Sequence, residues 1–105
     1  MVKLIVVVKI PNKLQGVLWS RDVSSLDIQK DKNYIIHQVL MYGSLEDIEW
    51  LKTIYSDIEI KEAFSNHPRK VYTKPAYNFI KNYLLGISKP LSEQKYVKTT
   101  PRDIR

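Results

Sequence analysis

The chain of 105 residues contains no cysteine and only three glycines. The lack of cysteine excludes disulfide bonds, thiolate metal sites and cysteine nucleophiles, and it leads us to expect a cytoplasmic protein. Three separate glycines cannot build a glycine-rich phosphate loop, and no Walker, Rossmann or kinase pattern is present. Nucleotide hydrolysis is therefore not an expected function.

Long apolar runs are also missing. The longest, Leu4 to Val8, is far shorter than the roughly 18 to 20 residues that cross a membrane, and no small-residue cleavage site follows it. We expect neither a membrane anchor nor a signal peptide. The length fits one domain, and two Trp, seven Tyr and two Phe provide large side chains for its core.

The net charge of +6 is unevenly distributed along the chain. Residues 1–43 carry +3 and residues 44–62 carry −4, whereas nine Lys or Arg against two acids give residues 63–105 a charge of +7. A basic region favours a polyanion or an acidic protein as partner, although a solvated lysine-rich surface gives the same composition. The candidate contacts with nucleic acid or an acidic partner are Arg69, Lys70, Lys74 and Lys81.

Apolar spacing and capping signals predict a mostly α fold, a compact bundle of about four helices with a helix-turn-helix-like middle. The expected helices are a first from a cap at Asp31 to Tyr42, and three more over residues 45–55, 56–66 and 73–86. Residues 1–87 form a single domain in this prediction, and residues 88–105 form a flexible basic tail.

Local signals mark the ends of these helices. Gly43 suits the left-handed residue that ends the first helix. Ser44 with Asp47, and Ser56 with Glu59, have the spacing of capping boxes. Thr73 is expected to cap the fourth helix, in which Pro75 is tolerated in the first turn.

The apolar spacing also predicts which faces are buried. In the first helix the buried residues are Ile35, Ile36, Val39 and Leu40. In the second they are Leu45, Ile48, Leu51 and Tyr55, widened by Trp50 and Ile54. In the fourth they are Ala76, Phe79 or Ile80, Tyr83 and Leu84.

The first ten residues, Met1 to Ile10, are rich in Val and Ile and stop at Pro11, which predicts one β-strand. A single strand needs a partner, and the candidates are an extended piece at residues 16–19 or the same strand in a second copy. A segment packed on helices is the alternative interpretation.

Few residues could support catalysis. Neither His37 nor His67 has a His or Cys at metal-ligand spacing, so we expect a helix-side residue and a loop residue; phosphate contact by His67 beside Arg69 and Lys70 is the alternative. The acids Glu46, Asp47 and Glu49 are best explained by the positive end of a helix dipole. We therefore expect no enzyme, no catalytic residue, no metal and no cofactor.

A resemblance adds a functional expectation. It is carried by the ordered series Leu18-Trp19, Leu26-Asp27, Lys30-Asp31, Ile35-Ile36, Val39-Leu40, Gly43, Asp47, Trp50-Leu51, Tyr55 and Ile60. The stretch from about Leu18 to Leu84 resembles a bacterial and archaeal domain family of unknown function, whose short helical members are often encoded beside nucleotidyltransferase-like toxins of the abortive-infection type. The resemblance implies an antitoxin-like or accessory role with a toxin-like protein as partner.

The expected function is a non-enzymatic protein-interaction module, an antitoxin-like component of a toxin–antitoxin pair. A DNA-binding regulator of the helix-turn-helix type is the first alternative. Its weakness is the third helix, which begins with Asp57 and Glu59 and would bring carboxylates toward phosphates. A structural or dimerisation module, with a homodimer formed through the N-terminal strand, is the second alternative.

Overall fold

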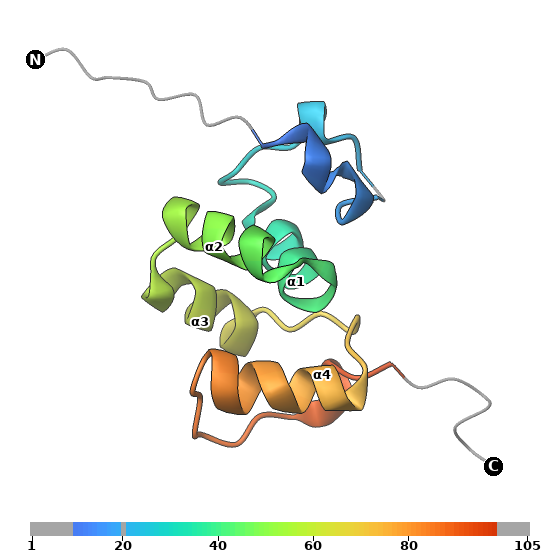
Figure 1. Ribbon diagram of the computed structural model, residues 1–105. Helices are drawn as coiled ribbons and strands as arrows, with labels where there is room; N and C mark the ends of the chain where they lie inside the picture. The colour runs from blue at the N-terminus through green and yellow to red at the C-terminus, as the bar shows by residue number, and fades with distance from the viewer. Residues whose placement is uncertain (1–9, 20, 99–105) are drawn as a thin grey trace, which may run out of the picture.

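The computed structural model describes residues 10–19 and 21–98. Its main elements are α1 (Lys32–Tyr42), α2 (Leu45–Ile54), α3 (Asp57–Asn66) and α4 (Lys74–Phe79), which a π-helical turn, η3 (Ile80–Leu84), continues. Shorter 3-10 turns are η1 (Asn12–Gly16), η2 (Val23–Ser25) and η4 (Glu93–Lys95). Figure 1 shows α1, α2 and α3 as one group, with η1 and η2 on one side and α4 on the other.

The predicted mostly α architecture is confirmed in the part of the chain that the structure describes. The strand predicted for Met1 to Ile10 lies, apart from Ile10 itself, outside the described residues. Its proposed mate at residues 16–19 is wrong, because Gly16 ends η1 and the N–H of Leu18 donates to the carbonyl of Leu14 at 2.8 Å in a helical turn. No helix within residues 10–19 and 21–98 combines the length and apolar character needed to cross a membrane.

The predicted capping boxes begin α2 and α3. The hydroxyl of Ser44 accepts from the N–H of Asp47 at 3.2 Å, and the Asp47 carboxylate accepts from the N–H of Ser44 at 2.9 Å. Ser56 and Glu59 form the same pair of bonds at 3.1 and 2.9 Å. Thr73 caps α4 as predicted. These bonds satisfy amide groups that have no partner within the helix.

The start of α1 differs from the prediction. Asp31 precedes the helix, but its side chain makes no capping bond. Its carboxylate turns back to accept from the N–H of Asp27 at 2.8 Å and lies 3.4 Å from the guanidinium of Arg21. The Asp31 carboxylate therefore bonds to the preceding turn and not, as was predicted, to the first amides of α1.

Gly43 ends α1, although not in the predicted left-handed conformation. Its φ and ψ are −77° and 160°, an extended conformation open to any residue. Glycine is needed there because an added Cβ would lie 2.6 Å from the carbonyl oxygen of Val39 and 3.0 Å from the Cβ of Asp47. The left-handed residue is Gly86, at φ +63°, after η3.

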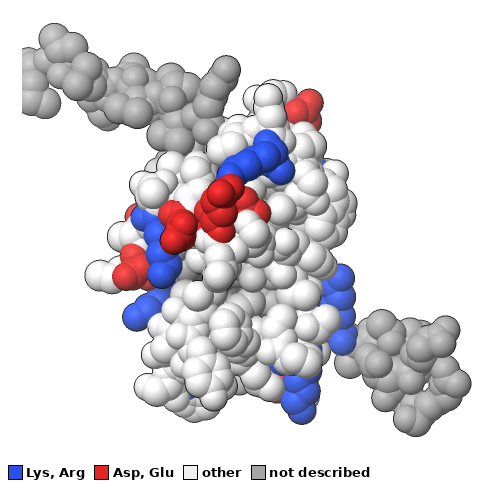
Figure 2. Space-filling model, in the orientation of Figure 1, with Lys and Arg blue, Asp and Glu red and all other residues white. Residues whose placement is uncertain are grey.

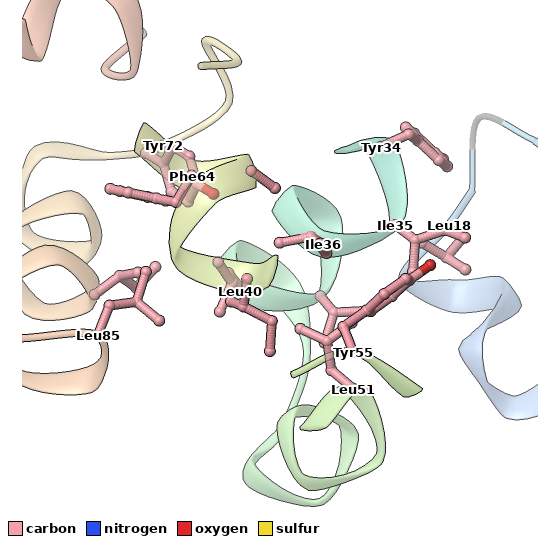
Figure 3. Packing of buried hydrophobic residues seen from close by; sticks show 14 of the residues in the cluster. Leu18, Tyr34, Ile35, Ile36, Leu40, Leu51, Tyr55, Phe64, Tyr72 and Leu85 are labelled. Atoms are coloured by element: carbon pink, nitrogen blue, oxygen red, sulfur yellow. The ribbon is translucent and has the colours of Figure 1, made fainter. Parts of the chain in front are cut away.

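The core forms around α1, whose residues 34–40 are all buried. Ile35, Ile36 and Val39 are fully enclosed, as predicted, and α1 packs against both α2 and α3. Figure 3 shows Leu40 among side chains from the other helices, with Leu85 reaching toward it from the end of the last helix. α1 supplies five of the buried hydrophobic residues, more than α2, α3 or α4.

Leu51 on α2 and Tyr55, the residue that follows α2, are buried as predicted, and Ile48 and Trp50 pack against the core from its edge. Leu45 is an exception, since 76% of it is exposed. The prediction for Leu45 is wrong because it is the first residue of α2 and only later turns of that helix reach the core.

On α4 and η3, the buried residues are Tyr77 and Ile80, with Leu84 partly buried. The predicted burial of Tyr83 is wrong, since this residue is 80% exposed. The N–H of Leu85 donates to the carbonyl of Ile80 at 2.8 Å, the i to i−5 bond of a π turn. Because a π turn contains more residues than an α turn, it rotates Tyr83 away from the inner face.

The chain then returns to the core in the region predicted to be tail. Tyr96 is 1% exposed, and its hydroxyl donates to the carbonyl of Phe64 at 2.6 Å. A parallel bridge joins Tyr72 to Val97, with the N–H of Lys98 donating to the carbonyl of Tyr72 at 2.9 Å. Residues 93–98 therefore pack with the domain, whereas residues 99–105 lie outside the described part of the chain.

Candidate binding surfaces

The structure places the four predicted basic contacts in different surroundings. Arg69 and Lys70 lie in the connection after α3, both exposed. The guanidinium of Arg69 stands over the ring of Tyr34, 5.3 Å from its centre, which is a cation–π contact. These two cations keep their charges at the surface.

The other two predicted cations have partners within the chain. The ammonium of Lys74 lies 4.0 Å from a carboxylate oxygen of Glu93. Lys81 is half-buried, and its ammonium donates to the carbonyl of Ile87 at 3.1 Å, which helps to close the end of the last helix. Lys74 begins α4 and Lys81 is the second residue of η3, and both have partners within the chain, whereas Arg69 and Lys70 lie in the connection before that helix.

The predicted acidic group lies on α2. Figure 2 shows acidic side chains gathered over that helix. Glu46 forms an ion pair with Lys13, and Asp47 belongs to the capping box. Both residues are in the first turn of α2, where carboxylates interact favourably with the helix dipole. Within the described residues, no three or more His, Cys, Asp or Glu side chains lie close enough together to hold a metal ion.

His37 is buried and hydrogen-bonded on both ring nitrogens. Nδ1 lies 2.6 Å from the hydroxyl of Tyr72, and Nε2 lies 2.7 Å from the carbonyl oxygen of His67. Because a carbonyl only accepts, Nε2 carries the proton and Nδ1 accepts from the hydroxyl. Burial lowers the pKa of His37 to about 4, so the ring is neutral at pH 7.

The same burial raises the pKa of Tyr72 above its ordinary value, so its hydroxyl keeps its proton. His37 has no exposed surface, and Tyr72 has none either. A substrate cannot reach this pair. The His37–Tyr72 pair joins α1 to the residue that follows α3 and to the bridge between Tyr72 and Val97, which is a structural role. The sequence predicted only that His37 lies on the side of a helix.

Two aromatic residues form an exposed face on the last helix, which we call the outer aromatic face (Phe79 and Tyr83). Phe79 is 54% exposed and Tyr83 is 80% exposed, and their ring centres are 6.1 Å apart. Asn78 and Asn82 are exposed beside them. Aromatic residues and asparagines alternate in this part of the sequence. The apolar spacing did not show, however, that Phe79 and Tyr83 are exposed whereas Tyr77 and Ile80 are buried.

A second exposed group, the Trp19 cluster, consists of Trp19, Tyr42 and Lys98. Trp19 is 55% exposed and meets the ring of Tyr42 edge to face, with ring centres 4.5 Å apart. The ammonium of Lys98 lies 3.1 Å from the Tyr42 hydroxyl and 5.9 Å from the centre of its ring. No sequence signal links these residues, because 56 positions separate Tyr42 from Lys98.

A small cavity of about 100 Å³ opens between α1, α2, α3 and the end of η3. Its apolar lining consists of Leu40, Ile48, Leu51, Ile60, Leu84 and Leu85. Lys52, Asp57 and Lys61 complete the lining. These charged residues are exposed at the rim of the cavity.

Residues 14–64 match the model of a family of unknown function, DUF6922. The expected resemblance to a domain family of unknown function is thereby confirmed over these residues. No curated protein and no solved structure matches the chain. The DUF6922 match runs from Leu14 in η1 to Phe64 in α3. Trp19 and Tyr42 lie inside it, and the outer aromatic face and Lys98 lie beyond it.

Proposed function

We propose that the chain is a non-enzymatic protein-interaction module, an antitoxin-like component that binds a toxin-like protein encoded nearby. The observation that carries this proposal is the outer aromatic face. Two large aromatic side chains, Phe79 and Tyr83, stand side by side in solvent at the end of a helix whose other face is buried. Burial of these rings against a partner removes apolar surface from water.

The chemistry of this face suits a protein partner. Aromatic side chains are enriched in the centres of protein interfaces, where a few of them supply most of the binding energy. The Tyr83 hydroxyl and the amides of Asn78 and Asn82 provide hydrogen-bonding groups around the rings. In the view of Figure 2, the surface over α4 is mostly uncharged, so few charges would lose their hydration on contact.

The regulator alternative has weaker support. α2 and α3 are separated by only two residues, Tyr55 and Ser56, which is short enough for a helix-turn-helix arrangement. The first turn of α3 carries Asp57 and Glu59, however, and a recognition helix placed there would oppose phosphates with carboxylates. Within residues 10–19 and 21–98, the start of α3 thus does not favour contact with phosphates, and duplex DNA binding stays a prediction. A dimer through residues 1–10 rests on the sequence alone.

The proposal is tested by co-expressing the chain with the product of its neighbouring gene and measuring the affinity by isothermal titration calorimetry. We expect a stable complex. Phe79→Ala and Tyr83→Ala should each weaken it at least about tenfold, which corresponds to roughly 1.4 kcal/mol. Neither change should alter the melting temperature by more than a degree or two, because both side chains are exposed.

The matched control is Ile58→Ala, which removes another large apolar side chain, 79% exposed, from α3. This variant should bind as tightly as the wild type. A wild-type chain that does not bind the neighbouring product would overturn the antitoxin-like assignment. Unchanged affinity in the Phe79→Ala, Tyr83→Ala double variant would remove the outer aromatic face from the interface.

A further inference from the structure

The backbone that presents Trp19 is fixed by the side chain of Gln15. The amide nitrogen of Gln15 donates to the carbonyls of Leu18 and Arg21 at 3.2 and 2.7 Å. Its amide oxygen accepts from the N–H of Val23 at 3.1 Å. The Gln15 side chain thus bonds to backbone groups before and after Trp19 in the sequence. These bonds limit the backbone conformations of Trp19.

The side-chain amide of Gln38 also bonds to the backbone close to Trp19. Gln38 on α1 is 4% exposed, and its side-chain nitrogen donates to the carbonyl of Val17 at 3.0 Å. The edge contact with Tyr42 then sets the orientation of the Trp19 ring. The Trp19 indole is therefore held in place by Gln15, Gln38 and Tyr42 in the absence of a ligand. Such preorganisation lowers the entropy cost of binding.

Two cations lie along the same helix. Arg69 stands over Tyr34 and Lys98 stands over Tyr42, and both tyrosines belong to α1. Eight residues separate the two tyrosines, which is about 12 Å along the helix axis and less than a quarter turn around it. Neither Arg69 nor Lys98 forms an ion pair with any carboxylate in residues 10–19 and 21–98.

The segments that supply the two tyrosines and the two cations are also poor in acidic residues. α1 itself contains no Asp or Glu, and residues 63–105, which supply both cations, carry nine Lys or Arg against two acids. Asp22, the carboxylate nearest to Trp19 in sequence, accepts hydrogen bonds from the N–H and the hydroxyl of Ser24, and Asp31 pairs with Arg21. Arg69 and Lys98 therefore carry charges that no carboxylate within residues 10–19 and 21–98 pairs with, and an anion can contact them.

An exposed aromatic ring beside cations spaced along one line is the combination that binds unpaired nucleotides. Bases of any sequence stack on such rings, and the cations contact the phosphates that follow. We propose that the Trp19 cluster, together with Arg69, is a binding site for single-stranded nucleic acid, with a base stacked on Trp19 and phosphates at Lys98 and Arg69. A duplex does not offer its base faces to Trp19, because they are stacked on each other.

The experiment uses the full chain and a fluorescently labelled oligothymidylate of about 15 nucleotides, with anisotropy read at about 50 to 200 mM salt. We expect binding that weakens with salt. Trp19→Ala should reduce the affinity about 5- to 100-fold, the effect of losing one stacked base. Trp19→Phe, which keeps an aromatic ring, should retain most of the affinity, and circular dichroism melts of both variants report whether the fold is intact.

The phosphate contacts are tested by Lys98→Gln and Arg69→Gln. Each should lower the slope of log affinity against log salt by about 0.7, the value for one contact with a single strand. Lys89→Gln, which removes the same charge from an exposed loop residue outside the cluster, should leave the slope nearly unchanged.

Three results would overturn the proposal. One is no binding of the oligonucleotide at about 50 mM salt, the condition that favours it most. Another is equal affinity for the matching duplex. The third is a folded Trp19→Ala variant that binds like the wild type. None of these results bears on the outer aromatic face, whose test uses a protein partner and different variants.

Discussion

The hydroxyl of Tyr72 lies 2.6 Å from Nδ1 of His37, in a core where neither side chain touches solvent. The bond crosses 35 positions of sequence and ties α1 to the extended residue that pairs with the C-terminal segment. Around it, the rings of Phe64, Tyr77 and Tyr96 lie within 4.8 to 6.1 Å of one another, centre to centre. The neutral form of His37 is therefore a condition for the packing of this half of the domain.

The first prediction concerns acid stability. The pKa of His37 is about 4 in the folded chain and about 6.5 when unfolded, so only the unfolded chain takes up this proton between those values. The contribution of His37 is complete above pH 6.5 and is lost as the pH falls to 4, by roughly 3 kcal/mol in the free energy of unfolding. Urea titrations at several pH values measure it.

The control for this prediction is His37→Gln, which cannot take up a proton. This variant is expected to be less stable at pH 7, with a much flatter profile between pH 6.5 and 4.5. Asp22, Asp27 and Glu59 have lowered pKa values through hydrogen bonds from nearby groups, so their stabilising effect is lost only in the more acidic range. Parallel profiles for wild type and variant would contradict the role given to His37.

A second prediction separates two leucines of α2. Leu51 is fully buried, and Leu51→Ala should cost about 2 to 5 kcal/mol of stability because it leaves a cavity in the core. Leu45→Ala, at a residue 76% exposed, should cost less than about 0.5 kcal/mol. Chemical denaturation of both variants gives the comparison, and equal losses would show that the packing of α2 is different.

The third prediction concerns Gly43. An alanine there would bring Cβ within 2.6 Å of the Val39 carbonyl oxygen, so Gly43→Ala should destabilise the chain by about 1 to 3 kcal/mol. Gly16→Ala is the matched control, since nothing lies within 4 Å of the added atom. It should be neutral or stabilise by up to about 1 kcal/mol. Thermal melts that rank the two variants in the opposite order would rule out the close approach at Gly43.

A fourth prediction tests whether residues 93–98 are part of the domain. Tyr96→Ala removes a ring that is 1% exposed and should cost about 3 to 5 kcal/mol. Tyr96→Phe keeps the ring and loses only the hydroxyl bonds to the carbonyls of Phe64 and Ser65, so it should cost about 1 to 2 kcal/mol. Tyr83→Ala, at an exposed tyrosine, is the control. A Tyr96→Ala melt identical to wild type would place the C-terminal segment outside the fold.

The sequence predicted the helices well because their ends depend on neighbouring residues. Ser44 with Asp47, and Ser56 with Glu59, are three positions apart, and both pairs form the expected bonds. The burial of Leu51 likewise follows from spacing within one helix. Where two local signals competed, as for the carboxylate of Asp31, the choice depended on the preceding turn and the prediction was wrong.

What the sequence did not reveal depends on contacts between distant segments. The return of Tyr96 to Phe64, the cation of Lys98 over Tyr42 and the enclosure of His37 have no periodic signature. The exposure of Tyr83 depends on a single π turn, which an apolar pattern cannot distinguish from an α turn. Both proposed binding surfaces therefore required the three-dimensional arrangement, although each consists of residue types that the composition already showed.

The contact between Phe64 and Tyr96 also has a consequence for folding during synthesis. The helices α1, α2 and α3 are complete in sequence by residue 66, but the ring of Phe64 receives its neighbour Tyr96 only after thirty further residues have been added. Until Tyr96 has left the ribosome, the nascent chain presents an unfinished aromatic cluster.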